Sequence, residues 1–193
     1  MMRRILLWWL RRQDCPREFT FPGALIRARR VLVFMPSKME PFRQAEYFLS
    51  RMPRVFERAK VTLLYPPKSL AATFYNPYGF EVVVPAAGEV GIFGWPGKKL
   101  LRRLFVRPFD LIITLDKEPN LFFAAVMMKS QTAARIGLPG GLGMPFTSVE
   151  FRPARATDDP KTEFILFIEM MRKLVTPPTV EETSGGAGVP QTP

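Results

Sequence analysis

The sequence predicts one α/β domain in which helices flank a mainly parallel sheet of about five to six strands. Three observations predict it. Short apolar runs, several of them rich in β-branched residues, alternate along the chain with segments of helical spacing. The run 111–115 is nearly all apolar, as expected for a strand buried on both faces of a parallel sheet. The chain of 193 residues is long enough for one sizeable core. Together these features favour a single three-layer domain with right-handed crossovers.

The elements follow from local patterns. Strands are predicted at residues 31–34, 61–65, 81–84, 111–115, 134–136 and, at an edge, 148–151. Helices are predicted at residues 41–51, 98–107, 119–129 and 161–175, and Pro53 either interrupts the first of them or starts a short one through Arg58. We expect Asp116 or Glu118 near the amino end of the helix at 119–129. A cap at Asp158 to Pro160 is expected to start the last helix.

Two segments of different composition flank the predicted domain at 23–175. Residues 1–22 comprise a short basic helix, with the apolar run 5–10 between pairs of arginines, and a proline-containing linker. The run is too short to span a bilayer, and no small-residue cleavage site follows it. Its tryptophans suit a membrane interface or, as an alternative, pack on the domain. Residues 176–193 have the composition of a disordered tail.

Charge and residue types limit the possible functions. The formal net charge of +11 predicts attraction to a polyanion, such as RNA, an anionic membrane surface or a phosphorylated glycan. The chain has no histidine, which excludes Ser–His and Cys–His catalysis and makes a zinc site implausible. No metal or cofactor is expected. The single cysteine, Cys15, excludes an internal disulfide and fits a reducing, cytoplasmic compartment.

Basic residues gather in three parts of the chain. They are Arg3, Arg4, Arg11 and Arg12 near the start, Arg27, Arg29 and Arg30 before the first strand, and Lys98, Lys99, Arg102, Arg103 and Arg107 in a predicted helix. The leucines of that helix are expected to pack inward and leave the basic side chains exposed. Such a face is either merely solvated or contacts phosphate or lipid headgroups.

Candidate site residues follow the strands, because ligands bind outside the carboxyl ends of parallel strands. The segments are 36–40, 66–69, 116–118 and 137–143. Glu40, with Lys38 as its electrostatic partner, is a candidate base at the first strand end. Asp116 is a second candidate catalytic residue, one that would bind an acceptor hydroxyl or a cation. Ser37 and Lys38 are candidate ligand-binding residues. The alternatives are a solvated loop pair and a helix cap.

A glycine-rich loop follows the fifth predicted strand. Gly137, Gly140 and Gly141 are candidates for cradling a phosphate through backbone N–H groups. The alternative is a plain turn, because Pro139 and Pro145 interrupt the loop and its spacing matches neither the dinucleotide nor the P-loop pattern.

Three segments carry a resemblance to a known family: VLVFMPSKME, FDLIITLD and AARIGLPG, within residues 30–141. They resemble the amino-terminal Rossmann-like domain of bacterial heptosyltransferase-type glycosyltransferases of the two-domain GT-B class, which build lipopolysaccharide cores at the cytoplasmic membrane face. In that family the loop after the first strand typically reads Ser-Leu-Gly-Asp, and its aspartate is implicated as the base. Ser37, Lys38, Met39 and Glu40 stand at these positions. The resemblance thus makes Glu40 the candidate base, although methionine replaces the glycine.

The resemblance also implies dependence on another domain. In that family a second, carboxyl-terminal domain mainly holds the nucleotide-sugar, and this sequence is too short to form one. We therefore expect a non-catalytic or partner-dependent relative of the amino-terminal domain, bound to an anionic surface or ligand at the inner face of the cytoplasmic membrane. The alternatives are a basic RNA- or ribosome-associated protein and a small glycosyltransferase of cell-envelope polysaccharide synthesis. A protein partner or a homo-oligomer is compatible with each.

Overall fold

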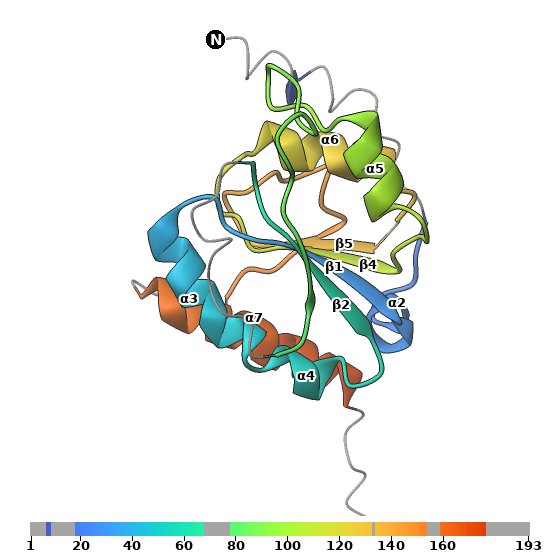
Figure 1. The fold of residues 1–193 in the computed structure, drawn as a ribbon. Helices are drawn as coiled ribbons and strands as arrows, with labels where there is room; N and C mark the ends of the chain where they lie inside the picture. Colours follow the sequence, from blue (N-terminus) through green and yellow to red (C-terminus); the bar gives the residue numbers. More distant parts are fainter. Residues whose placement is uncertain (1–6, 9–17, 68–77, 133, 154–158, 177–193) are drawn as a thin grey trace, which may run out of the picture.

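The core of the fold is a parallel sheet. The computed structural model describes residues 7–8, 18–67, 78–132, 134–153 and 159–176 (Figure 1). Within these residues the strands have the order β3-β2-β1-β4-β5-β6, and every pair of neighbours is parallel. Their bounds are β1 Arg30–Phe34, β2 Lys60–Leu64, β3 Glu81–Val83, β4 Leu111–Thr114, β5 Ala134–Gly137 and β6 Val149–Glu150. The predicted α/β class is confirmed, and the order is that of a doubly wound Rossmann sheet.

Helices cover both faces of the sheet (Figure 1). One face carries α2 (Gly23–Arg27), α3 (Met39–Leu49), α4 (Met52–Val55) and α7 (Pro160–Val175), and the other carries α5 (Lys98–Leu104) and α6 (Leu121–Lys129). From β1 the chain proceeds outward through β2 to β3 and then returns across the sheet to β4. Because right-handed crossovers in opposite directions place their helices on opposite faces, α3 and α4 lie opposite α5 and α6.

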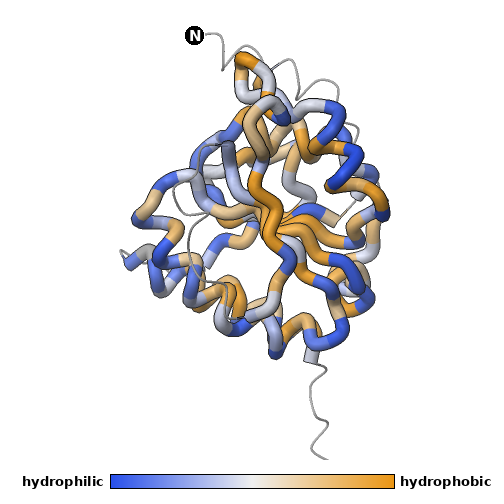
Figure 2. Tube along the Cα trace, viewed as in Figure 1, coloured by the Kyte–Doolittle hydropathy of each residue, from blue (hydrophilic) through white to orange (hydrophobic). Residues whose placement is uncertain are grey.

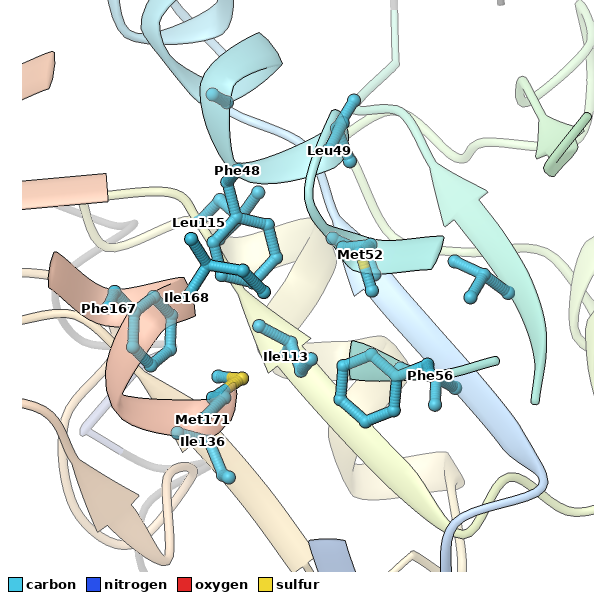
Figure 3. Close-up of a cluster of buried hydrophobic side chains, with 14 of the residues drawn as sticks. Phe48, Leu49, Met52, Phe56, Ile113, Leu115, Ile136, Phe167, Ile168 and Met171 are labelled. Atoms are coloured by element: carbon cyan, nitrogen blue, oxygen red, sulfur yellow. The ribbon is translucent and has the colours of Figure 1, made fainter. Parts of the chain in front are cut away.

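The larger part of the core lies between the sheet and the helices α3, α4 and α7 (Figure 3). Ile113 of β4 and Ile136 of β5 face it from the sheet, and each is at most 1% exposed. From the helices, Phe48 and Phe167 meet with ring centroids 5.3 Å apart. Alternate residues of the strands thus face the two cores, which explains why every residue of β4 is buried.

A second core lies between the sheet and the helices α5 and α6. Phe34 of β1 stacks on Phe123 of α6 with ring centroids 4.5 Å apart. Every residue of α6 from Leu121 to Met127 is buried. Leu7, Val90 and Trp95, which come from distant parts of the sequence, pack against the same core. Helix α6 is therefore enclosed, so its sequence needs no polar face.

Four details differ from the expectations. The short helix α2 was not predicted, and α4 ends at Val55, before Arg58. Helix α5 ends at Leu104, shortly before Pro108, which cannot continue a helix. The cap of α6 is neither Asp116 nor Glu118, which come before the residue that directly precedes the helix. It is Asn120, whose side-chain oxygen accepts a hydrogen bond from the Phe122 N–H at 3.0 Å.

The remaining expectations concern the start of the last helix and residues outside the described ranges. Helix α7 is capped by Asp159, which accepts hydrogen bonds from the N–H groups of Lys161 and Thr162. Several predictions fall on residues outside the described ranges. They concern the arginines at positions 3, 4, 11 and 12, positions 68–69, Asp158 and nearly all of the tail.

Candidate functional site at the switch point of the sheet

The segments that follow β1 and β4 diverge at the carboxyl edge of the sheet. The two strands are hydrogen-bonded neighbours, but the chain leaves β1 toward α3 on one face and β4 toward α6 on the other. Such a point is the usual ligand position in an open parallel sheet. Two of the predicted segments, 36–40 and 116–118, therefore meet at this switch point.

Asp116 is the centre of this site. The Ser37 hydroxyl donates to Asp116 Oδ2 at 2.5 Å, the Glu118 N–H donates to Oδ1 at 3.2 Å, and the Asn120 amide donates to Oδ2 at 3.4 Å. The residue is only 5% exposed. Burial raises the pKa of the Asp116 carboxyl, although its three hydrogen bonds act in the opposite direction. We call Ser37, Asp116, Glu118 and Asn120 the Asp116 cluster.

Both lysines of these segments are paired. Lys38 forms an ion pair with Glu118 of the segment after β4, and its hydrogen bond to Glu118 raises the pKa of Lys38. Lys117 forms an ion pair with Glu163 of α7, and its Nζ lies 5.5 Å from the centroid of the Phe164 ring. The segment after β4 is thus tied both to the segment after β1 and to the last helix.

Glu40 has a different hydrogen-bond partner from the residues of the Asp116 cluster. It is exposed in the first turn of α3, and its Oε1 accepts a hydrogen bond from the Gln44 amide at 3.1 Å. A carboxylate at this position interacts favourably with the helix dipole. Among the described residues, no hydrogen bond or ion pair joins Glu40 to Asp116, so its role as a base stays a prediction.

The glycine loop packs on the segment after β4. A Cβ on Gly141 would lie 2.6 Å from the Asp116 carbonyl oxygen, and Gly140 has a φ of +81°. A Cβ on Gly137 would lie 2.6 Å from Thr114 Cγ2 and 2.7 Å from Thr147 Cγ2. These contacts within the protein account for glycine at all three positions. The phosphate cradle stays a prediction.

Two members of the site were not predicted. Asn120 directly precedes the apolar run of α6, and asparagine before such a run is a recognisable cap, so a local signal was present. Glu163 comes from α7, 46 residues after its partner Lys117. No local pattern could have paired them. Within the described ranges, no three Asp, Glu, Cys or His side chains gather closely enough to hold a metal ion.

The basic helix α5 has the expected orientation. Leu100 and Leu104 are buried, while Lys98, Lys99, Arg102 and Arg103 are exposed. Arg103 Nη2 donates to the carboxylate of buried Glu89 at 2.7 Å. Within the described part of the chain, the side chains of Lys98, Lys99 and Arg102 make no ion pair.

A second basic surface lies at the amino edge of the sheet. A groove of about 880 Å³ lies between α2, α4 and the end of α7. Helices α2 and α4 both contact α7. The side chains of four arginines line the groove and form no ion pair with any described residue: Arg27, Arg29, Arg54 and Arg58. Glu57 contributes the one acidic side chain of its lining. Among the described residues, no helix is both long and apolar enough to cross a bilayer.

The fold has a counterpart among solved structures. The crystal structure of the glycosyl transferase family 9 protein from Veillonella parvula matches with a TM-score of 0.58 and 18% sequence identity. The fold is glycosyltransferase-like. The match covers 81% of this chain and 43% of that chain, so this chain spans less than half the length of that protein. It confirms, at the level of the fold, the resemblance carried by the three sequence segments. No family model and no curated protein matches the sequence.

Proposed function

We propose that this protein is a partner-dependent relative of a glycosyltransferase amino-terminal domain, which holds a hydroxyl-bearing ligand at the switch point without transferring a sugar alone. The Asp116 cluster is the observation that carries the proposal. A general base must accept a proton from its substrate, yet both oxygens of Asp116 already accept hydrogen bonds from the protein. Asp116 is also only 5% exposed, so we infer that it organises the switch point and that a ligand meets the more exposed groups around it.

The charge around the Asp116 cluster favours sugar hydroxyls over a bare phosphate. Lys38 and Lys117 are each neutralised by a glutamate, and Asp116 and Glu40 add further carboxyl groups. Carboxylates accept hydrogen bonds from hydroxyls and repel phosphates. Exposed Glu40 then contributes by accepting from a ligand hydroxyl at the rim.

Two measurements test this proposal. Saturation-transfer NMR with neutral mono- and disaccharides is expected to show binding that weakens in Glu40→Gln and persists in Glu46→Gln, a matched change at an exposed position of the same helix. Nucleoside diphosphate sugars are expected to give neither a thermal shift nor nucleotide release with the protein alone. Nucleotide release that is lost in Glu40→Gln would contradict the proposal and establish the small glycosyltransferase.

The same proposal places the protein on an anionic membrane surface, at the inner face of the cytoplasmic membrane. The unpaired basic side chains of α5 and the arginine-rich residues 1–12 support it. Vesicles with anionic lipid should bind the intact chain better than a chain lacking residues 1–12. Because Leu7 packs against the second core, a full-length variant with glutamine at positions 3, 4, 11 and 12 controls for folding. Equal binding of all three proteins would discard a role for the segment.

RNA binding is the second candidate, and the arginine-lined groove favours it. Four unpaired cations around one groove repel one another, and a polyanion relieves that repulsion. RNA affinity should then fall steeply with salt, and Arg27→Gln/Arg54→Gln/Arg58→Gln should flatten that dependence. An affinity that does not change with salt, or a slope unchanged in this variant, would exclude RNA binding through the groove.

A further inference from the structure

A short hairpin before α5 exposes apolar residues at its tip. An antiparallel bridge joins Val90 to Pro96, and the Gly91 N–H donates to the Trp95 carbonyl at 2.8 Å. Gly94, with a φ of +78°, completes the turn. At the tip, Ile92 is 97% exposed and Phe93 is 58% exposed. In Figure 2 the hydrophobic tip belongs to the loop at the top of the view, next to α5 in Figure 1.

The base of this hairpin is anchored to the fold. Buried Glu89 accepts hydrogen bonds from the Ala86 N–H at 2.9 Å and from Arg103 of α5 at 2.7 Å. The Gly97 N–H closes the base by donating to the Glu89 carbonyl at 2.7 Å. Val90 and Trp95 pack against the second core. The fold therefore holds the tip out into water, although water is an unfavourable environment for two large apolar side chains.

A basic surface adjoins the tip. Helix α5 begins at Lys98, directly after the base of the hairpin, and Lys98, Lys99 and Arg102 are exposed without a described ion-pair partner. Val106, just after α5, is 78% exposed. An apolar protrusion beside cations matches an anionic bilayer, whose phosphates overlie acyl chains. A protein partner would match the apolar tip as well, but nothing in its general chemistry requires the cations.

We propose that residues 89–97 form a membrane-insertion hairpin: Ile92 and Phe93 enter the acyl boundary, and Lys98, Lys99 and Arg102 contact lipid phosphates. This inference rests on the proposed membrane association and identifies the surface that makes it. The helical residues Leu7 and Trp8 lie on the same side of the sheet, since Leu7 packs against the second core, and Trp8 is 54% exposed. The helices α3, α4 and α7 would face away from the bilayer.

Vesicle partitioning of full-length variants tests the hairpin. Removing the two apolar side chains in Ile92→Ser/Phe93→Ser should lower partitioning into anionic vesicles roughly 50-fold, from the usual cost of exposing partly buried side chains of this size. Leu166→Ser, which changes an exposed leucine of α7 on the opposite face, is the matched control and should leave partitioning unchanged. Lys98→Gln/Lys99→Gln should lower partitioning roughly 10-fold or more at low salt and less at high salt. Arg43→Gln/Lys173→Gln removes the same charge from α3 and α7, with a smaller effect.

A depth measurement distinguishes insertion from surface contact. In a Cys15→Ser background, which removes the single native cysteine, an environment-sensitive fluorophore at Ile92→Cys should shift to the blue with vesicles and be quenched from within the acyl region. The same label at Leu166→Cys should do neither. Binding that is unchanged in Ile92→Ser/Phe93→Ser overturns the hairpin while leaving the membrane proposal standing. No binding of the intact chain overturns both. If Ile92→Ser/Phe93→Ser loses self-association and keeps vesicle binding, the tip contacts a second copy of the chain. That result also overturns insertion.

Discussion

Gly137, at the end of β5, gives the sharpest test of how the glycine loop is built. In Gly137→Ala the new Cβ would lie 2.6 Å from Thr114 Cγ2 and 2.7 Å from Thr147 Cγ2. Carbon atoms in contact prefer about 3.5–4.0 Å, so both methyl groups would be about 1 Å too close. Both threonines are buried, at 1% exposure each.

The cost follows from this double clash. Overpacking a well-packed core costs about 1–3 kcal/mol, and two simultaneous contacts place Gly137→Ala near about 3 kcal/mol. For a domain of this size that lowers Tm by roughly 6–12 °C. Gly91→Ala is the matched control, because its Cβ would meet the Trp95 carbonyl oxygen at an ordinary 3.7 Å.

A mutant cycle isolates the two methyl groups. Thr114→Ser/Thr147→Ser removes both and keeps the hydroxyls, so Gly137→Ala in that background should cost less than about 1 kcal/mol, a coupling energy of about 2 kcal/mol. Urea unfolding, followed by far-UV circular dichroism, measures each variant. A cost that is the same in both backgrounds, or below about 0.5 kcal/mol in the native background, would refute the close-packing explanation.

Two further predictions concern the Asp116 cluster. Because burial raises the pKa of Asp116, the native state holds its proton more tightly than the unfolded state, so ionisation lowers stability as pH rises from the ordinary aspartate pKa to the raised one. The stability of Asp116→Asn relative to the native protein should therefore increase through that window in urea titrations between about pH 3 and pH 7; a constant or decreasing difference would contradict this. Asn120→Ala removes the cap of α6 and one donor to Asp116, and should cost about 1–2 kcal/mol in the free energy of unfolding at neutral pH. A loss below about 0.5 kcal/mol would show that water replaces both hydrogen bonds.

The strands were predictable because their signals are local. The run after Asp110 is apolar on both faces, as only a central parallel strand requires, and prolines and glycines delimit its neighbours in the sequence. The membership of the site was also predictable in part, since Ser37, Lys38 and Asp116 follow strands. Their contact was not, because the strand order that brings Ser37 and Asp116 together across 79 residues is a property of the whole sheet.

The hairpin before α5 illustrates the opposite case. Its two arms are too short to show an alternation of apolar and polar residues. Its conformation depends on the ion pair of Glu89 with Arg103 and on the packing of Val90 and Trp95 against the second core. Composition can only mark Gly91 and Gly94 as turn residues. The exposure of Ile92 is likewise invisible in the sequence, where an isoleucine beside a phenylalanine resembles core.

The enclosed helix α6 joins two surfaces that the sequence keeps apart. One side of its core is closed by Val90 and Trp95 at the base of the hairpin, and its first turn is held by Asn120, which also donates to Asp116. The second core and helix α6 therefore lie between the base of the hairpin and the Asp116 cluster. If both ends are occupied, thermodynamic reciprocity requires that a bilayer at the tip change sugar affinity by the same factor by which the sugar changes bilayer affinity. Measuring vesicle affinity with and without the sugar, and sugar affinity with and without vesicles, would give the coupling free energy between the two sites.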